Sequence, residues 1–481
     1  MSSSTVHEKL ATSTAVVEAA TILTLDSRKV LRKLDLRLLP PVCILYLLCF
    51  LDRTNIGNAK VAGLVADLHL TGIQFNLCVA ILLIPYSLLE VPSNIALKRF
   101  GPSRWLPIIM FIWGSIVVSM AFVKGFGGLM TARVFLGAVE SGLLPGLTYY
   151  LCAWYPKSAQ AKRIGAMYSG VSLAGAFGGL LAFAIEKMNG IGGLAGWSWI
   201  FLLEGLLTVF VATVFYFYMY DYPENATFLT DAERAWLLEA IKHDNAGGSK
   251  QFKREFIIQA LRDPQAYIFA AMFFLGAVPA VSFTVFLPTI INGLGYSSTH
   301  AQLLSIPPNA VGCIFTLAVS YLSDKKRVRG PFILVGSTVA IVGYVLLLAT
   351  KTLAVQYAGS VIVAAGLLPS IATLLAWIGG NFGGEVKKAV AIGFVIGFGN
   401  LGGVVASFIY RQQDSPRYLP GHAACIASLC VLIVLSALSM IRLHKLNRSK
   451  IAQCEHEGIT ADKSEAFAEL GDGSPLYRYT L

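Results

Sequence analysis

Long apolar segments occupy most of this chain and constrain its fold more than any other feature. An α-helix needs about 20 mostly apolar residues to cross a bilayer, and hydropathy predicts twelve such segments. They cover residues 38–59, 75–97, 104–123, 129–151, 164–186, 197–220, 266–291, 303–323, 332–350, 353–377, 389–410 and 421–442. Only 14% of the residues are charged, against about 25% in a typical soluble domain. We therefore expect an all-α membrane protein with twelve transmembrane helices.

The longest interruption between apolar segments divides the chain into two halves of six predicted helices each. Within it, Thr230 and Glu233 form a capping-box pattern that predicts a short helix. The apolar residues of this helix predict that it lies along the membrane surface. The chain from Lys450 onward mixes acids with glycine and predicts disorder. The expected domains are an N-terminal tail (1–37), a first bundle (38–220), a linker (221–265), a second bundle (266–442) and a C-terminal tail (443–481).

The two halves carry similar motifs at an offset of 225 residues. The matched positions are Lys162 with Lys387, Arg163 with Lys388, Ala166 with Ala391, and Gly178 with Gly403. Glycine clusters near these positions allow membrane helices to approach closely. Two six-helix repeats with a site between them are typical of transporters that work by alternating access. We therefore expect two pseudo-symmetric bundles.

The net charge of +11 could suggest a nucleic-acid partner, but its distribution favours a different explanation. With the N-terminus in the cytosol, about 30 of the 38 Lys and Arg residues fall in cytosolic segments. Only about six fall on the opposite side, which is the bias that orients membrane proteins. The charge therefore predicts both termini in the cytosol and no nucleic-acid partner.

Four charged residues lie inside predicted membrane segments. Asp52 and Arg53 close the first segment, and each costs about 2.5–3.5 kcal/mol to insert. Arg133 and Glu140 lie in the fourth segment, two helical turns apart and so on one face, about 10 Å from each other. We expect these four residues to form the working centre of a transporter. The alternative is that Asp52 and Arg53 are a buried ion pair that only fixes helix packing.

Several longer motifs support a family resemblance. They are Leu51–Gly57, Arg133–Gly137, Leu173–Gly179, Gly196–Phe201 and Phe286–Ile291. On these motifs the chain resembles the major facilitator superfamily over residues 38–442, and within it the fungal allantoate permease–like branch of the anion:cation symporters. The loop motif of the superfamily is degraded after the second segment, where Asn94 replaces glycine and Lys98 replaces the acid. The later copy of this loop keeps Asp324.

The resemblance implies roles for the buried charges. Arg53 and Arg133 would bind an anionic substrate, since a guanidinium pairs with a carboxylate through two parallel donors. Asp52 and Glu140 would carry protons, because a poorly solvated carboxyl changes protonation when nearby charges move. A fourth-segment arginine also recurs across the superfamily, so Arg133 alone is weak evidence for symport.

Other residues are expected to have gating, structural or neutral binding roles. We expect Glu90 to form a gate pair with Lys98 and Arg99, Asp324 to act in the matching loop, and Glu204 to be structural. No charged residue lies inside the last six predicted segments before Arg411, so the second half should supply neutral contacts. The candidates are Asn292, Trp377, Asn381 and Asn400, with Tyr46, Tyr86 and Tyr168 opposite them.

These features predict a proton-coupled symporter that imports a small organic anion across a fungal plasma membrane. The resemblance suggests a carboxylate, a ureido acid such as allantoate, or a vitamin such as nicotinate, pantothenate or biotin. The alternative is an exporter of a fungal secondary metabolite, since direction cannot be read from residues. A nutrient sensor is less expected with short tails. We expect no enzyme activity, no bound cofactor or metal, and function as a monomer.

Overall fold

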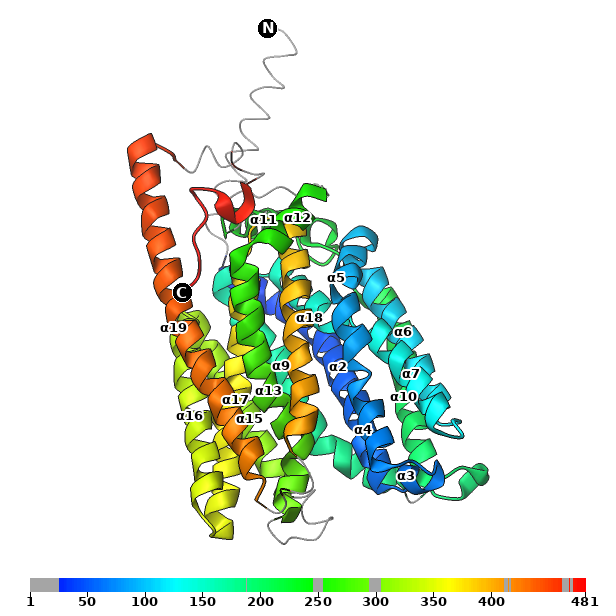
Figure 1. Ribbon diagram of the computed structural model, residues 1–481. Coiled ribbons are helices and arrows are strands. Elements are labelled where there is room, and N and C mark those ends of the chain that lie inside the picture. Colours follow the sequence, from blue (N-terminus) through cyan, green and yellow to red (C-terminus); the bar gives the residue numbers. More distant parts are fainter. Residues whose placement is uncertain are drawn as a thin grey trace.

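The structure is a computed structural model that describes residues 26–186, 188–244, 254–293, 304–410, 414, 417–460, 467 and 470–481. Among these residues every regular element is a helix (Figure 1). Eleven helical stretches in the described residues are long and apolar enough to cross a membrane. A further helix, α9 (Lys157–Glu186), occupies the fifth expected segment. The expected all-α fold with twelve membrane helices is confirmed.

Both halves contain six membrane-spanning positions. In the first half these are α2 (Ser27–Val61), α4 (Gly72–Ala80) with α5 (Leu83–Phe100), α6 (Pro102–Met120), α7 (Phe126–Glu140) with α8 (Leu143–Trp154), α9, and α10 (Gly196–Tyr218). In the second half they are α13 (Pro264–Gly293), α15 (Ile306–Lys326), α16 (Gly330–Ala349), α17 (Leu353–Gly380), α18 (Glu385–Ile409) and α19 (Leu419–Glu457). The short α3 (Leu64–Asp67) follows α2, and α11 (Asp231–Asp244) and α12 (Arg254–Arg262) join the halves.

The halves meet through two crossings that repeat one another. Helix α9 packs on α2 in its own half and on α15 in the other, and α18 packs on α13 in its own half and on α5 in the other. Glycine makes both crossings close. A Cβ at Gly165 of α9 would lie 2.1 Å from Oγ of Ser320, and one at Gly397 of α18 would lie 2.8 Å from the carbonyl oxygen of Ser87. The two bundles are thus related by the pseudo-symmetry that the sequence repeats predict.

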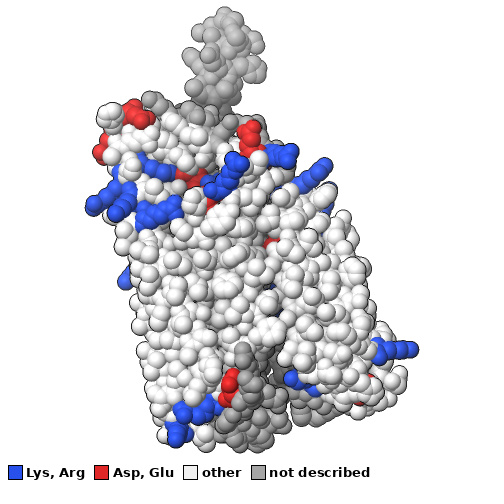
Figure 2. All heavy atoms as spheres, viewed as in Figure 1, with Lys and Arg blue, Asp and Glu red and all other residues white. Residues whose placement is uncertain are grey.

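The surface distinguishes a membrane-facing belt from its two ends. Lys and Arg gather near the upper end of the view, beside α11 and α12 (Figures 1 and 2). We call this end, which carries Asp26 and residues 470–481, the terminal face. Below it the side of the molecule in this view is largely uncharged (Figure 2). Large apolar side chains of the membrane-spanning helices are exposed, such as Phe217 of α10 at 83%. Such exposure of a large apolar side chain is expected where lipid is the solvent.

The linker helix α11 begins as the capping box predicts. The backbone N–H of Thr230 donates to Oε2 of Glu233 at 2.8 Å, and the N–H of Glu233 donates to Oγ1 of Thr230 at 3.3 Å. Its apolar side packs on the protein, with Leu237 fully buried, rather than on the membrane surface as expected. An ion pair between Lys33 and Glu233, at 2.8 Å, holds it against α2.

Among the described residues, helical structure extends into both expected tails. Helix α2 begins at Ser27, capped by Asp26, so it starts well before residue 38. Helix α19 continues to Glu457, and residues 470–481 pack against the terminal face, where Tyr477 is fully buried. The expectation of disorder is therefore wrong for these residues. Their sequence mixes acids with glycine and proline, but their hydrogen-bond partners come from distant helices.

Candidate functional site

An ion pair deep in the first half joins α2 to α7. Nε of Arg53 lies 2.5 Å from Oε1 of Glu140, and Sγ of Cys49 donates to the same oxygen at 2.9 Å. The Glu140 side chain is 1% exposed, whereas 19% of the Arg53 side chain is exposed. The guanidinium also lies 4.4 Å from the ring centroid of Tyr86. Glu140 is therefore a desolvated carboxylate that depends on Arg53, and Nη2 of Arg53 is buried without a partner among the described residues.

Arg133 lies on α7 with Glu140 but takes no part in that ion pair. It is 2% exposed, and its Nε and Nη2 have no hydrogen-bond partner among the described residues. An uncompensated buried charge is strongly destabilising. Arg133 is thus a buried cation with capacity to accept an anionic partner.

Asp52 faces a different part of the bundle from its neighbour Arg53. Its carboxylate accepts from Nε1 of Trp113 at 2.7 Å and from Oγ1 of Thr208 at 3.2 Å. Asn55 donates to Asp52 at 3.4 Å and to Oε2 of Glu204 at 2.7 Å. Asp52 and Glu204 therefore belong to one buried polar network that ties α2 to α6 and α10.

The expected four-residue centre is consequently divided. Consecutive residues on a helix point about 100° apart, so Asp52 and Arg53 cannot both face α7. Arg53 and Glu140 come together as expected. Asp52 does not join them, and it forms no ion pair with Arg53 in the part of the chain that the structure describes.

A polar contact between Asn400 and Glu90 crosses the boundary between the halves. Nδ2 of Asn400 on α18 donates to Oε1 of Glu90 on α5 at 2.8 Å. Glu90 is fully buried, and its Oε2 has no partner among the described residues. The expected pairing of Glu90 with Lys98 and Arg99 is not observed, because eight residues of helix separate Glu90 from Lys98 by about 12 Å. Arg99 is exposed at the end of α5.

Two polar contacts tie the halves together at the terminal face. Asp324, which pairs with Arg329 at 2.6 Å, accepts the backbone N–H groups of Ala161 and Lys162 near the start of α9. In the other half, Lys98 pairs with Glu385, the first residue of α18. The two contacts occupy corresponding positions in the two halves, but their charges differ. Asp324 is an acid that accepts from the start of α9, whereas Lys98 is a cation that pairs with an acid at the start of α18.

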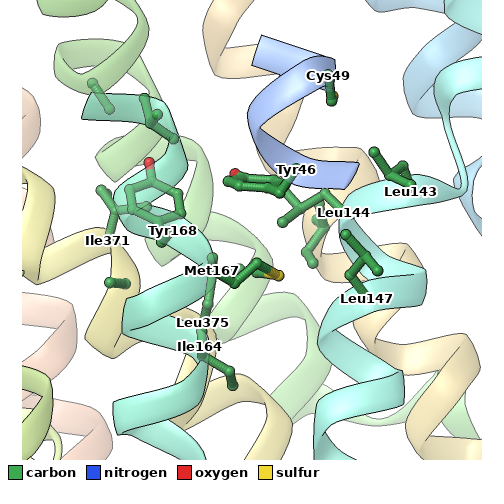
Figure 3. Packing of buried hydrophobic residues seen from close by; sticks show 14 of the residues in the cluster. Tyr46, Cys49, Leu143, Leu144, Leu147, Ile164, Met167, Tyr168, Ile371 and Leu375 are labelled. Atoms are coloured by element: carbon green, nitrogen blue, oxygen red, sulfur yellow. The ribbon is translucent and has the colours of Figure 1, made fainter. Parts of the chain in front are cut away.

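The aromatic candidates fall into two places. Tyr46 and Tyr168 lie close together between α2 and α9, with ring centroids 6.0 Å apart and with Ile371 of the second half nearby (Figure 3). The Tyr46 hydroxyl is buried without a described partner. Trp377, by contrast, lies at the terminal end of α17, where Nε1 donates to the carbonyl of Thr480 at 2.7 Å. Trp377 is therefore not part of the central cluster.

Some polar residues of the site were not predicted as such. Cys49 stands four residues before Arg53, and this i, i+4 spacing could have placed both on one face. Asn55 lies within the motif Leu51–Gly57, and the sequence predicts no role for it. Glu385 was missed because its partner Lys98 is remote in sequence. Asn381 lies with Trp377 at the terminal end of α17, and the side chain of Asn292 lies outside the described residues.

Comparison with known proteins agrees with this architecture. The model of the family described as "Major Facilitator Superfamily" matches residues 42–407. An uncharacterised transporter of Schizosaccharomyces pombe is 36% identical over 94% of this chain and 90% of its own length. The high-affinity nicotinic acid transporter of Saccharomyces cerevisiae is 30% identical over 94% of this chain and 84% of its own length.

Among solved structures, the proton:xylose symporter XylE superposes with a TM-score of 0.65. The superposition covers 84% of this chain and 95% of that one, at 16% sequence identity, so it bears on the fold alone. The family match, by contrast, covers most of the chain, including both halves. The protein therefore belongs to the Major Facilitator Superfamily and is a multi-pass membrane transporter of small molecules, not an enzyme.

Proposed function

We propose that this transporter imports a small organic anion together with protons. The observation that carries the proposal is the buried pair of Arg53 and Glu140, at 2.5 Å. A substrate carboxylate can pair with the guanidinium through two parallel donors, and the same guanidinium neutralises Glu140. Substrate and Glu140 therefore compete for one cation.

This competition couples the anion to a proton. When the substrate takes Arg53, Glu140 is left as a buried charge without its cation, at a cost of several kcal/mol. Proton uptake by Glu140 removes that charge. Arg53 thus binds either a deprotonated Glu140 or a substrate anion beside a protonated Glu140. Asp52, with its three donors on α2, α6 and α10, is assigned to packing in this mechanism rather than to proton transfer.

The surrounding residues fit the same scheme. Arg133 supplies a second buried cation for the bound state, and Tyr46 and Tyr168 offer hydroxyl groups beside α2. Asn400 of the second half, which now holds Glu90, supplies a neutral contact at the boundary where substrate must sit in alternating access. The first half would thus supply two positive charges to the substrate, and both halves would supply hydrogen bonds to it.

We further propose that the terminal face is cytosolic and that the protein acts in the plasma membrane. The clustering of Lys and Arg at this face supports the orientation (Figure 2). In this conformation the contacts of Lys98 with Glu385 and of Asp324 with α9 close the cytosolic side, so they must break when the transporter opens inward. The similarity to a nicotinic acid transporter, over 94% of the chain, supports the anion:cation symporter branch and makes nicotinate the first substrate to test.

The test is uptake of labelled nicotinate, pantothenate, biotin and allantoate by yeast that lacks its own permeases for organic anions. Uptake is measured at acidic and neutral pH, with and without a protonophore, in the wild type and in Glu140→Gln. The exposed substitution Glu239→Gln on α11 is the matched control. We expect acid-stimulated, protonophore-sensitive uptake that Glu140→Gln abolishes while exchange of substrate across the membrane persists.

Each other outcome counts against a stated part of the proposal. Uphill uptake that Glu140→Gln leaves unchanged refutes the proton role of Glu140. No uptake of any of the four compounds, with the protein shown at the cell surface, refutes import and favours the export of a secondary metabolite.

A further inference from the structure

The terminal face contains a built site that residues 470–481 of the same chain occupy; this segment begins with a short 3-10 helix and a turn, and its last five residues have no regular secondary structure. Two asparagine side chains hold the backbone of consecutive residues. Asn447 of α19 donates to the carbonyl of Tyr479 and accepts from its N–H, both at 2.8 Å. Asn381, at the end of α17, does the same for Thr480, at 3.1 and 2.8 Å. This reciprocal pairing recognises the main chain of these two residues rather than a particular side chain.

Side chains anchor the rest of the segment. Tyr477 is fully buried, its hydroxyl donates to the carbonyl of Gly380 at 2.9 Å, and Nζ of Lys157 lies 3.7 Å from its ring centroid. Asp472 pairs with Lys387 of α18 at 2.5 Å. Burial beside Asp472 raises the pKa of the Tyr479 hydroxyl, which therefore stays protonated and donates to the Asp472 carbonyl.

The segment contacts both halves of the transporter. Asn381, Lys387 and Asn447 belong to the second half. Lys157, the first residue of α9, belongs to the first half and donates to the carbonyl of Arg478 at 3.3 Å. Arg329 of the second half links the same groups, since its guanidinium donates to the carbonyl of Lys157 at 2.9 Å and its backbone N–H donates to the backbone oxygen of Leu481. Docking of residues 470–481 therefore holds α9 against α17, α18 and α19.

We propose that residues 470–481 are a latch: they bind this site reversibly and hold the terminal face closed, and their release precedes opening on that side. Opening moves the start of α9 away from α17 and α18, so the segment cannot keep its contacts with Lys157 and with Asn381 at once. The latch acts on the opening of this face and needs no particular substrate. It stands independently of the proton-coupled mechanism above.

The first experiment measures docking by limited trypsin digestion of the full-length protein in detergent. In the docked state the carbonyl of Arg478 is held by Lys157, so cleavage after Arg478 should be slow. Asn447→Ala removes both hydrogen bonds to Tyr479, and Tyr477→Ala removes the buried anchor. We expect each variant to be cleaved after Arg478 on the order of tenfold faster than the wild type, as followed by mass spectrometry.

Ser449→Ala, an exposed substitution on the same helix, is the control and should behave as the wild type. Size-exclusion profiles and melting temperatures show whether each variant is folded. Cleavage at the wild-type rate in both Asn447→Ala and Tyr477→Ala overturns the proposed docking.

The second experiment asks whether docking closes the terminal face. Cys152 lies buried between α8 and α17, so close that a Cβ at Gly379 would be 2.4 Å from its Sγ. Separation of the halves at this end exposes it. We expect N-ethylmaleimide to modify Cys152 several times faster in Asn447→Ala than in the wild type, quantified by peptide mass spectrometry. If Asn447→Ala is cleaved quickly after Arg478 but its Cys152 is modified at the wild-type rate, then release of the segment does not open the terminal face, and the proposal is overturned. Neither readout uses a transport substrate.

Discussion

Replacing Arg53 with methionine tests the ion pair at the centre of the proposed mechanism. The substitution leaves Glu140, which is 1% exposed, with Cys49 as its described donor. Removing one partner of a buried ion pair costs about 3–5 kcal/mol. Because 19% of the Arg53 side chain is exposed, water already screens part of the interaction. We therefore expect a loss of about 3 kcal/mol, at the lower end of that range.

The loss of stability should depend on pH in Arg53→Met but not in Glu140→Gln. In Arg53→Met the unpaired Glu140 can take up a proton, so the destabilisation is largest at neutral pH and shrinks as the pH falls. In Glu140→Gln the unpaired group is Arg53, which stays charged at every accessible pH. Its destabilisation therefore does not shrink in acid. In Arg53→Met/Glu140→Gln neither member of this pair is left as an unpaired charge, so the combined loss should be smaller than the sum of the two single losses by at least about 1 kcal/mol.

The assay is the apparent melting temperature of each purified variant in detergent, followed by tryptophan fluorescence at neutral and acidic pH. One kcal/mol shifts the melting temperature by about 2–4 °C in domains of 150–250 residues and by less in longer chains. We therefore expect a loss of a few degrees in Arg53→Met at neutral pH, and none in the exposed control Arg448→Met. Additive single losses, to within about 0.5 kcal/mol, or an Arg53→Met loss that is independent of pH, would refute the pairing.

Three further predictions concern contacts between helices. Lys98→Glu should speed the modification of Cys152 by N-ethylmaleimide, and the exchange Lys98→Glu with Glu385→Lys should restore the wild-type rate; a rate that stays high after the exchange contradicts a gate role for this pair. Asn55→Leu should lower the melting temperature by an amount equivalent to about 1–3 kcal/mol, because Asp52 and Glu204 lose a shared donor; an unchanged melting temperature argues against the network. Gly397→Val should cost about 1–3 kcal/mol through overpacking against α5, which thermal unfolding beside Val405→Ala, an exposed substitution on the same helix, can measure.

The sequence by itself determined the membrane fold, because apolar length and charge are local properties of the chain. Each segment of about 20 apolar residues must form a helix in lipid, whatever its neighbours are. The pairing of Arg53 with Glu140 was also within reach, since a charge inside the membrane needs a partner and few candidates existed. The helix start at Thr230 and Glu233 was predictable because a capping box is also local: both residues lie within one helical turn.

Only the tertiary structure decided which side chains face one another across the bundle. Asp52 turns to Trp113 and Thr208 because the rotation of α2 is set by its packing on α9 and α10, and a single residue along a helix changes the direction by about 100°. Because the tail mixes acids with Gly471, Gly473 and Pro475, the sequence predicts disorder for residues 470–481. They are ordered by Asn447 and Asn381, which stand 32 and 99 positions away from the residues they hold. Hydrogen bonds of this kind exist only once the helices that carry the partners have assembled.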